Sequence, residues 1–168
     1  MDRVVVMGCA GSGKSTLARE LAARTALPLT ERDALGAMGS REYLEALTEL
    51  AARPRWILDG APYYADELIY RVADTVVFLD YPKPLVVWRA LRRTVRIELT
   101  RRPAGAHKPG GSAIWRDPRH PLRWAWTSHQ VRRQEGRTLL TRPDLPNLKF
   151  LHLTRPAQAT RWLHRLHR

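Results

Sequence analysis

A glycine-rich stretch near the start of the chain, GCAGSGKST at 8–16, constrains the fold more than any other feature of the sequence. An apolar run, RVVVM at 3–7, precedes it, and TLARELAAR at 16–24 follows with its leucines and alanines at helical spacing. The stretch satisfies the pattern G-x-x-x-x-G-K-[ST], which a chain of this composition matches by chance with odds of roughly one in a thousand. The sequence therefore predicts a buried strand, a phosphate-binding loop and a helix, in that order.

The loop residues have chemical roles that follow from their types. Glycines let the backbone wrap around a phosphate, and the N–H groups of the loop and of the helix start then point at that phosphate. Lys14 reaches the β- and γ-phosphate oxygens of a nucleotide, and Ser15 is a candidate ligand for Mg²⁺. We expect ATP to be bound by the loop residues Gly8, Gly11, Ser12, Gly13, Lys14, Ser15 and Thr16.

Hydrophobic periodicity divides the rest of the chain into alternating strands and helices. Strands are predicted at 3–7, 27–29, 55–58, 75–79 and 148–153. Helices are predicted at 14–24, at 41–52 after an N-cap at Ser40, at 64–72, 84–100 and 121–135, and beyond a cap at Thr154. This alternation implies an α/β fold with three layers and a mainly parallel sheet. Ligands bind at the carboxyl ends of such strands, which is where the sequence places Gly8, Asp33, Asp59 and Asp80.

Composition limits the cellular setting. Cys9 is the single cysteine of the 168 residues, so no intrachain disulfide forms, which fits a reducing compartment. No apolar run approaches the ~18 residues of a membrane span, and the start of the chain lacks the features of a signal peptide. The six histidines lack metal-ligand spacing, so no zinc site is expected. We expect one cytoplasmic, monomeric domain over 1–168, with no membrane partner.

Charge is distributed unevenly along the chain. The net charge is +13; residues 1–80 carry 9 basic and 12 acidic side chains, whereas residues 81–168 carry 20 and 4. A basic half implies an anionic partner, either the phosphates of a small molecule or a nucleic acid. An arginine-rich composition with a solvated surface would explain the excess equally well.

Two further motifs resemble those of adenylate kinases and related nucleoside monophosphate kinases. WILDGAP at 56–62 resembles their third-strand motif, and DTVVFLDYPKPLVVWRALRR at 74–93 resembles their fourth strand and the base of their lid. Within this family, the chain most resembles the adenylate kinase-related topology-modulation (FlaR-like) proteins, for example in the DAL at 33–35 and the DG at 59–60. The resemblance implies a P-loop fold with a five-stranded parallel sheet in the order 2-3-1-4-5, and an arginine-rich helical lid at about 97–135.

The resemblance also implies roles for four residues outside the loop. Asp59 corresponds to a carboxylate that holds Mg²⁺ through water, and Arg89 corresponds to an arginine that lies over the adenine face. Arg93 corresponds to an arginine that contacts the phosphates. Asp33 corresponds to an acid near the acceptor hydroxyl, where it would act as general base. Each has a structural alternative: a loop cap for Asp59, an exposed helix face for the arginines and a turn for Asp33.

The chain departs from adenylate kinases on the acceptor side. Those enzymes follow the third-strand motif with an arginine that grips the acceptor phosphate, whereas Tyr63 and Tyr64 follow Pro62 here. AMP is therefore not assigned as the acceptor. Further positive charge for a migrating phosphoryl group would come from the basic half, where the candidates are Arg92, Arg96, Arg101, Arg102, Arg116, Arg119, Arg123, Arg132 and Arg133.

Two classes of function fit these features. The first is a P-loop kinase that transfers the γ-phosphoryl group of ATP to a nucleotide or other small-metabolite acceptor, with Mg²⁺ as cofactor and Lys14, Asp33 and Arg93 as catalytic residues. The second is a nucleic-acid-associated NTPase involved in DNA topology modulation, which the net charge and the resemblance both indicate. We favour the kinase, because ATP alone explains the loop and the lid arginines, and the sequence contains no recognised nucleic-acid-binding module.

Overall fold

The computed structural model describes residues 1–100 and 121–166, and the side chains of residues 1–96 and 126–166. Its strands are β1 (Arg3–Gly8), β2 (Leu29–Glu31), β3 (Trp56–Asp59), β4 (Thr75–Leu79) and β5 (Lys149–Leu153). Its helices are α1 (Lys14–Thr25), the short 3-10 helix η1 (Arg32–Ala34), α2 (Arg41–Ala52), α3 (Asp66–Val72), α4 (Lys83–Thr100), α6 (Pro121–Leu140) and α7 (Pro156–Arg165).

The five strands form one parallel sheet in the order β2-β3-β1-β4-β5, which confirms the predicted order. β1 lies at the centre, where Val4 pairs with Ile57 of β3 on one side and with Thr75 of β4 on the other. Because all strands run in the same direction, their carboxyl ends meet at one edge of the sheet. The phosphate-binding loop leaves the sheet at the middle of that edge.

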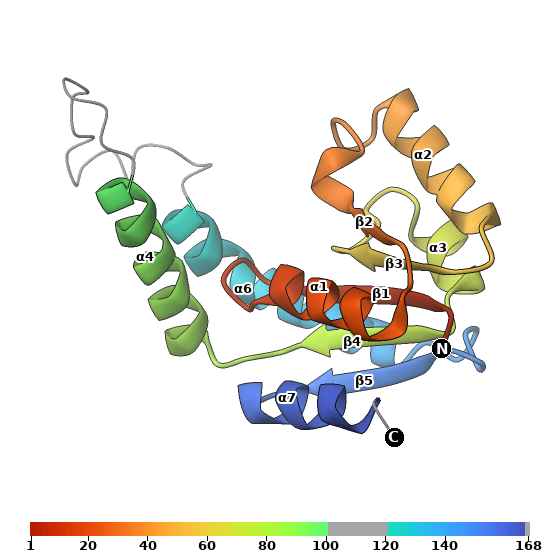
Figure 1. Ribbon diagram of the computed structural model, residues 1–168. Helices are drawn as coiled ribbons and strands as arrows, with labels where there is room; N and C mark the ends of the chain where they lie inside the picture. Colours follow the sequence, from red (N-terminus) through yellow and green to blue (C-terminus); the bar gives the residue numbers. More distant parts are fainter. Residues whose placement is uncertain (101–120, 167–168) are drawn as a thin grey trace.

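Helices cover both faces of the sheet, as the alternating pattern predicts (Figure 1). Val4 and Val6 of β1 face α1 and α7, in a core that includes Leu17, Leu21 and Leu163. Val5 and Met7 face the opposite side, in a core with Tyr43, Leu47, Ile69 and Leu139 from α2, α3 and α6. A central strand that is buried on both faces needs apolar residues at successive positions, which explains the uninterrupted run in β1.

Several predicted boundaries are confirmed, and others are wrong. Ser40 caps α2 as expected, since its hydroxyl accepts a hydrogen bond from the Tyr43 N–H at 3.2 Å. Thr154 does not cap the last helix. The N-cap is Arg155, and the Gln158 side chain accepts from the N–H groups of both Thr154 and Arg155, at 2.7 and 2.9 Å. The second strand begins at Leu29 rather than at 27, because only Leu29–Glu31 pair with β3.

The helix predicted over 121–135 continues to Leu140, past Gly136. Glycine weakens a helix by about 1 kcal/mol relative to alanine, but here the missing side chain allows close packing. A Cβ at Gly136 would lie 2.4 Å from the Phe78 ring. The predicted lid-like segment at 97–135 therefore includes the end of α4 and much of α6, and its central part, 101–120, lies outside the described residues.

None of the helices within the described residues combines the length and apolar character needed to cross a membrane.

Candidate active site

The loop between β1 and α1 has the backbone that its glycines predict. Gly11 and Gly13 have φ values of 84° and 90°, in the left-handed region that favours glycine. Gly11 also lies against α4, because a Cβ there would be 2.4 Å from the Val86 carbonyl oxygen. Gly13 is the N-cap of α1 and has no side chain that could accept a hydrogen bond from the first turn. The N–H groups of Lys14, Ser15 and Thr16 therefore face the loop without a side-chain acceptor. That arrangement is suited to binding an anion at the helix start.

The loop is closed by contacts of its own backbone. The Ser12 N–H donates to the Cys9 carbonyl at 3.1 Å, and the Ser12 carbonyl accepts from Nη1 of Arg89 on α4, also at 3.1 Å. Ser12 is 1 % exposed, and its Oγ has no hydrogen-bond partner among the described residues. A buried hydroxyl without a partner is unfavourable, and an anion in the loop would provide an acceptor for it.

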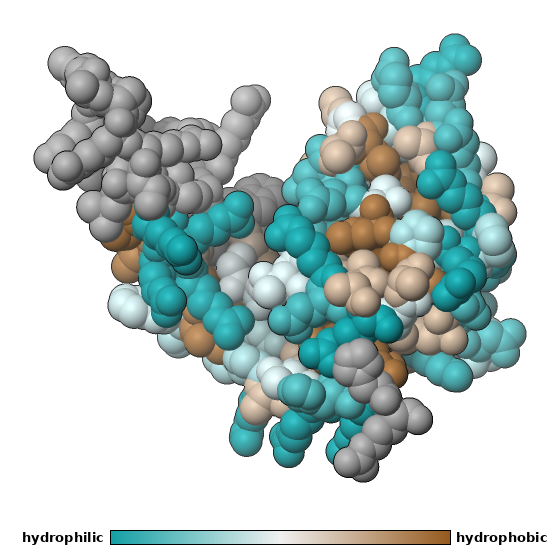
Figure 2. All heavy atoms as spheres, in the orientation of Figure 1, coloured by the Kyte–Doolittle hydropathy of each residue, from teal (hydrophilic) through white to brown (hydrophobic). Residues whose placement is uncertain are grey.

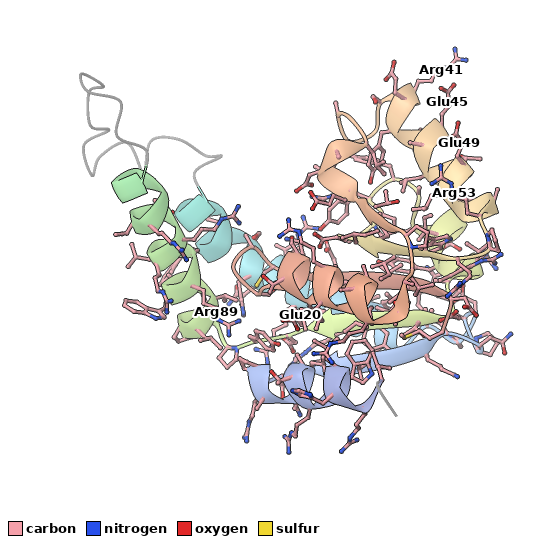
Figure 3. The ribbon with its side chains drawn as sticks, viewed as in Figure 1. Glu20, Arg41, Glu45, Glu49, Arg53 and Arg89 are labelled. Atoms are coloured by element: carbon pink, nitrogen blue, oxygen red, sulfur yellow. The ribbon has the colours of Figure 1, made fainter. Side chains whose placement is uncertain are left out.

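Arg89 and Arg93 lie one turn apart on the side of α4 that faces the loop, as their spacing predicts. Figure 3 shows Arg89 near the start of α4. Its guanidinium lies over the Tyr81 ring, 5.5 Å from the ring centroid, and also donates to the loop at the Ser12 carbonyl. The hydrogen bond between Arg89 and the loop was not predicted from the sequence. Arg93 is exposed. Arg89 therefore connects the base of α4 to the phosphate-binding loop.

Two cavities meet at the loop. The first, of about 640 Å³, lies among the loop, α1, α4 and α7, and includes Arg89, Tyr81, Thr160 and Leu163 in its lining. The second, of about 690 Å³, lies on the other side of the loop and is lined by residues that follow β2 and β3 and by parts of α4 and α6. Both cavities are lined by Gly11, Lys14 and Arg93.

The second cavity occupies a region between α4 and the part of the chain that carries α2. Figure 2 shows the surface hollowed between these two parts, with hydrophilic side chains along α4. Met38 and Tyr64 line the cavity on one side, and Ala90 and Arg93 line it on the other. The charged side chains of Arg41, Glu45 and Glu49 on α2, and of Arg53 directly after it, point away from the sheet and do not line this cavity (Figure 3).

Two arginines reach an aromatic ring inside the second cavity. The guanidiniums of Arg32 and Arg132 lie over the Tyr63 ring, at 5.0 and 4.3 Å from its centroid. Arg132 also pairs with Glu135 at 2.6 Å, and Arg32 pairs with Asp33. Burial raises the pKa of the Tyr63 hydroxyl, although Arg132 acts in the opposite direction, so this hydroxyl stays protonated at neutral pH. No sequence pattern indicated a role for Arg32, Tyr63 or Glu135 in this group, because it is assembled from three distant segments.

The predicted acid after the second strand, Asp33, lines the second cavity and is well exposed, with 78 % of its side chain accessible. It belongs to η1 rather than to an open turn. Cys9 lines the same cavity, and burial raises the pKa of its thiol to about 11. The thiol is therefore neutral near pH 7.

Asp59 ends β3 at the same edge as the loop and is 7 % exposed. Its Oδ1 is buried and has no hydrogen-bond partner among the described residues. A carboxylate oxygen in that state is costly unless a cation or a cation-bound water satisfies it. Together with the Ser15 hydroxyl at the start of α1, this donor set fits Mg²⁺, which prefers oxygen ligands and keeps several of its waters.

Asp80 also follows a strand at this edge, but it is not part of the cavities described above. Its side chain, 2 % exposed, bonds Arg133 on α6 and His152 on β5. Of the candidate lid arginines whose side chains are described, Arg132 faces the second cavity, Arg133 faces Asp80, and Arg92 and Arg96 lie on the exposed part of α4. The remaining candidates, Arg101, Arg102, Arg116, Arg119 and Arg123, lie outside the residues whose side chains are described.

Solved structures of small-molecule kinases superpose on nearly the whole chain. A shikimate kinase from Acinetobacter baumannii, in complex with shikimate, shares 17% identity at a TM-score of 0.53, over 99% of this chain and 90% of that one. A gluconokinase from Sinorhizobium meliloti 1021 shares 19% sequence identity at a TM-score of 0.52, over 99% of this chain and 93% of that one. A sugar kinase from Janibacter sp. HTCC2649 shares 21% sequence identity at a TM-score of 0.50, over 96% of this chain and 90% of that one.

No protein-family model and no curated protein matches the sequence. The resemblance to the topology-modulation group stays a prediction. Identities below 25% show a shared fold, and that fold agrees with the sheet order and the loop. The chain has the three-layer α/β fold of P-loop kinases, with a five-stranded parallel sheet in the order 2-3-1-4-5.

Proposed function

We propose that the chain is a P-loop phosphotransferase that moves the γ-phosphoryl group of ATP to a hydroxyl of a small-molecule acceptor. The observation that carries this proposal is the pair of cavities that meet at Gly11, Lys14 and Arg93. A nucleotide in the first cavity would place its terminal phosphate at this junction, and an acceptor in the second would approach from the opposite side. Such an arrangement supports in-line transfer with both reactants held in position.

In the proposed reaction, the acceptor oxygen forms a bond to the γ-phosphorus as the bond to the β–γ bridging oxygen breaks, and ADP leaves. Lys14 and Arg93 neutralise charge on the migrating group. Asp33 takes the proton of the acceptor hydroxyl. The loop N–H groups hold the phosphates, and Arg89 contacts the nucleotide near the base. Mg²⁺, held by Ser15 and through water by Asp59, would neutralise phosphate charge when bound.

The second cavity supports an acceptor that carries an anionic group. Tyr63 stands where adenylate kinases have their acceptor-side arginine, yet Arg32 and Arg132 bring two guanidiniums to that same ring. Guanidinium groups bind carboxylate or phosphate through paired hydrogen bonds, which neutral sugars cannot match. The named substrates of two structural neighbours, shikimate and gluconate, are hydroxylated carboxylates of this kind.

The test is a screen of acceptors with ATP and Mg²⁺, following ADP release and the phosphorylated product by ³¹P NMR. Pairs of similar size but different charge, such as gluconate and glucose, separate an anionic acceptor from a neutral one, and nucleosides and nucleotides complete the screen. Asp33→Asn should abolish product formation while leaving ADP affinity unchanged, and Arg161→Ala on α7 should behave as wild type. The proposal fails if Lys14→Ala and wild type give the same product yield.

The alternative, a nucleic-acid-associated NTPase, is supported by the net charge of +13. It predicts binding to duplex DNA whose affinity falls steeply with salt, because each phosphate contact releases counterions. It also predicts that DNA, rather than a small acceptor, accelerates ATP turnover. DNA binding without any acceptor-dependent product would favour this alternative over the kinase.

A further inference from the structure

Asp80 is a buried carboxylate directly after β4, and its charged and polar partners on α6 and β5 are partly exposed. Its Oδ1 lies 2.9 Å from Nε of Arg133 on α6, and its Oδ2 lies 3.0 Å from Nε2 of His152 on β5. Nη2 of Arg137, one turn further along α6, is 4.0 Å from the same carboxylate. Because the carboxylate is 2 % exposed, its charge depends on these partners for compensation, whereas the partly exposed arginines keep contact with solvent. Asp80 therefore attaches α6 to the edge of the sheet.

Two more contacts lie on the same face of α6. Nε2 of His129 lies 2.9 Å from the Tyr81 carbonyl oxygen, and Gly136 packs directly on the Phe78 ring. The α6 residues 129, 133, 136 and 137 are three or four apart, so they form one stripe along the helix. This stripe contacts three residues, Phe78 in β4 and Asp80 and Tyr81 directly after it.

A neighbouring stripe of α6 faces the second cavity. Arg132 and Glu135 line this cavity, with the Arg132 guanidinium over the Tyr63 ring. Arg132 directly precedes Arg133, so the two side chains leave the helix about 100° apart and reach different neighbours. The position of Arg132 in the cavity therefore depends on where the other stripe is attached to β4.

We propose that Asp80 is a positioning residue, which fixes α6 on the sheet so that Arg132 and Glu135 form the wall of the acceptor cavity. The acceptor role of this cavity rests on the function proposed above. The attachment itself does not, and it can be tested without any acceptor. The side-chain partners of Asp80 described above lie on α6 and β5, and Asp80 does not line the first cavity.

Cys9 provides a specific probe for this proposal. It is the only cysteine, it lines the second cavity, and it is 5 % exposed. Release of α6 would open the cavity, so Asp80→Asn should raise the rate of Cys9 modification by iodoacetamide about tenfold. The Kd for MgADP should change by less than about threefold, since the side-chain partners of Asp80 lie on α6 and β5 and Asp80 does not line the first cavity. Asp80→Glu, which retains the charge, should restore part of the protection.

Arg133→Gln separates positioning from simple electrostatics. Loss of the Asp80 charge alone would lower the pKa of the Cys9 thiol and so speed its modification. Loss of the Arg133 charge alone would have the opposite electrostatic effect and slow the reaction. Release of α6 instead speeds the reaction in both variants. Because the Arg133 side chain is 44 % exposed, this variant should fold even if Asp80→Asn does not.

Asp74→Asn is the control for a general loss of stability. Asp74 accepts hydrogen bonds from the N–H groups of Asp2 and Arg3, at the opposite edge of the sheet. Rates are compared at denaturant concentrations that give equal free energies of unfolding. Faster modification in Asp80→Asn and Arg133→Gln, but not in Asp74→Asn, supports the proposal. Equal rates in all three variants, or opposite changes in the first two, overturn it; the acceptor screen tests the proposed function separately.

Discussion

Gly11→Ala should damage both the stability of the chain and its affinity for nucleotide. At φ 84°, an alanine costs about 1–2 kcal/mol, because its Cβ is crowded in the left-handed region. The new Cβ would also lie 2.4 Å from the Val86 carbonyl oxygen, which is backbone and cannot rotate away. The loop and α4 must therefore separate by roughly 1 Å, and overpacking of this kind costs about 1–3 kcal/mol.

Gly39→Ala is the matched control, because it isolates the steric contact from the backbone strain. Gly39 has φ 80°, nearly the same as Gly11, but a Cβ there would meet only the Tyr64 ring at 3.5 Å, an ordinary contact. The control should lose about 1–2 kcal/mol, and Gly11→Ala should lose a further 1–3 kcal/mol, roughly. For a chain of this size the further loss lowers Tm by about 2–12 °C relative to the control.

Nucleotide binding should separate the two variants more clearly than stability. Separation of the loop from α4 breaks the 3.1 Å hydrogen bond between Arg89 and the Ser12 carbonyl and moves the N–H groups that face the phosphates. We expect Gly11→Ala to bind MgADP about tenfold or more weakly by calorimetry, a difference of about 1.4 kcal/mol, with Gly39→Ala unchanged. Equal affinities and equal Tm values for the two variants would refute the close packing of loop and α4.

Three further predictions address the charged and titratable groups. Lys14→Ala should greatly weaken ATP and ADP binding in calorimetry while leaving thermal unfolding unchanged, because this lysine lines the cavities and not the core. Arg89→Lys should weaken MgADP binding by about 1 kcal/mol, the scale of one stacking contact, and Arg93→Ala should lower turnover more than affinity. The control Arg161→Lys should change neither binding nor turnover. Identical behaviour of all three variants would show that these arginines are only surface charge. Modification of Cys9 should be slow at pH 7 and accelerate until the pH reaches its pKa of about 11, since only the thiolate reacts, and a rate that levels off near pH 8.5 would contradict the burial of the thiol.

The parts of the fold that the sequence predicts well are those with local causes. The loop between β1 and α1 depends on glycines within six residues, and the Ser40 cap depends on a residue three positions away. The sheet order came from a resemblance in two motifs, and the structure confirms it. For the loop and the cap, the determining residues are neighbours in sequence; the sheet order instead came from the family resemblance.

The parts that escaped prediction depend on contacts between distant segments. The Arg32, Tyr63 and Arg132 group needs η1, the residues after β3 and α6 to meet, and no spacing rule encodes that meeting. The helix predicted over 121–135 was too short, and the Phe78 ring that occupies the missing side-chain space of Gly136 is 58 residues away in sequence. Thr154 suggested a cap by residue type alone, whereas the Gln158 side chain fills that role.

The central position of β1 has a consequence for synthesis on the ribosome. β1 is made first, but its neighbours β3 and β4 begin only at Trp56 and Thr75, and β5 follows at Lys149. At 5–20 residues per second, the interval between Val4 and Ile57, the first of its sheet partners to be made, is about 3–11 s. For that time the Val4–Val6 run has neither of its sheet partners, and it is a stretch that could pair with another nascent chain. A slower ribosome would lengthen this exposure, so the yield of folded protein should fall when codons between β1 and β4 are replaced by rare ones.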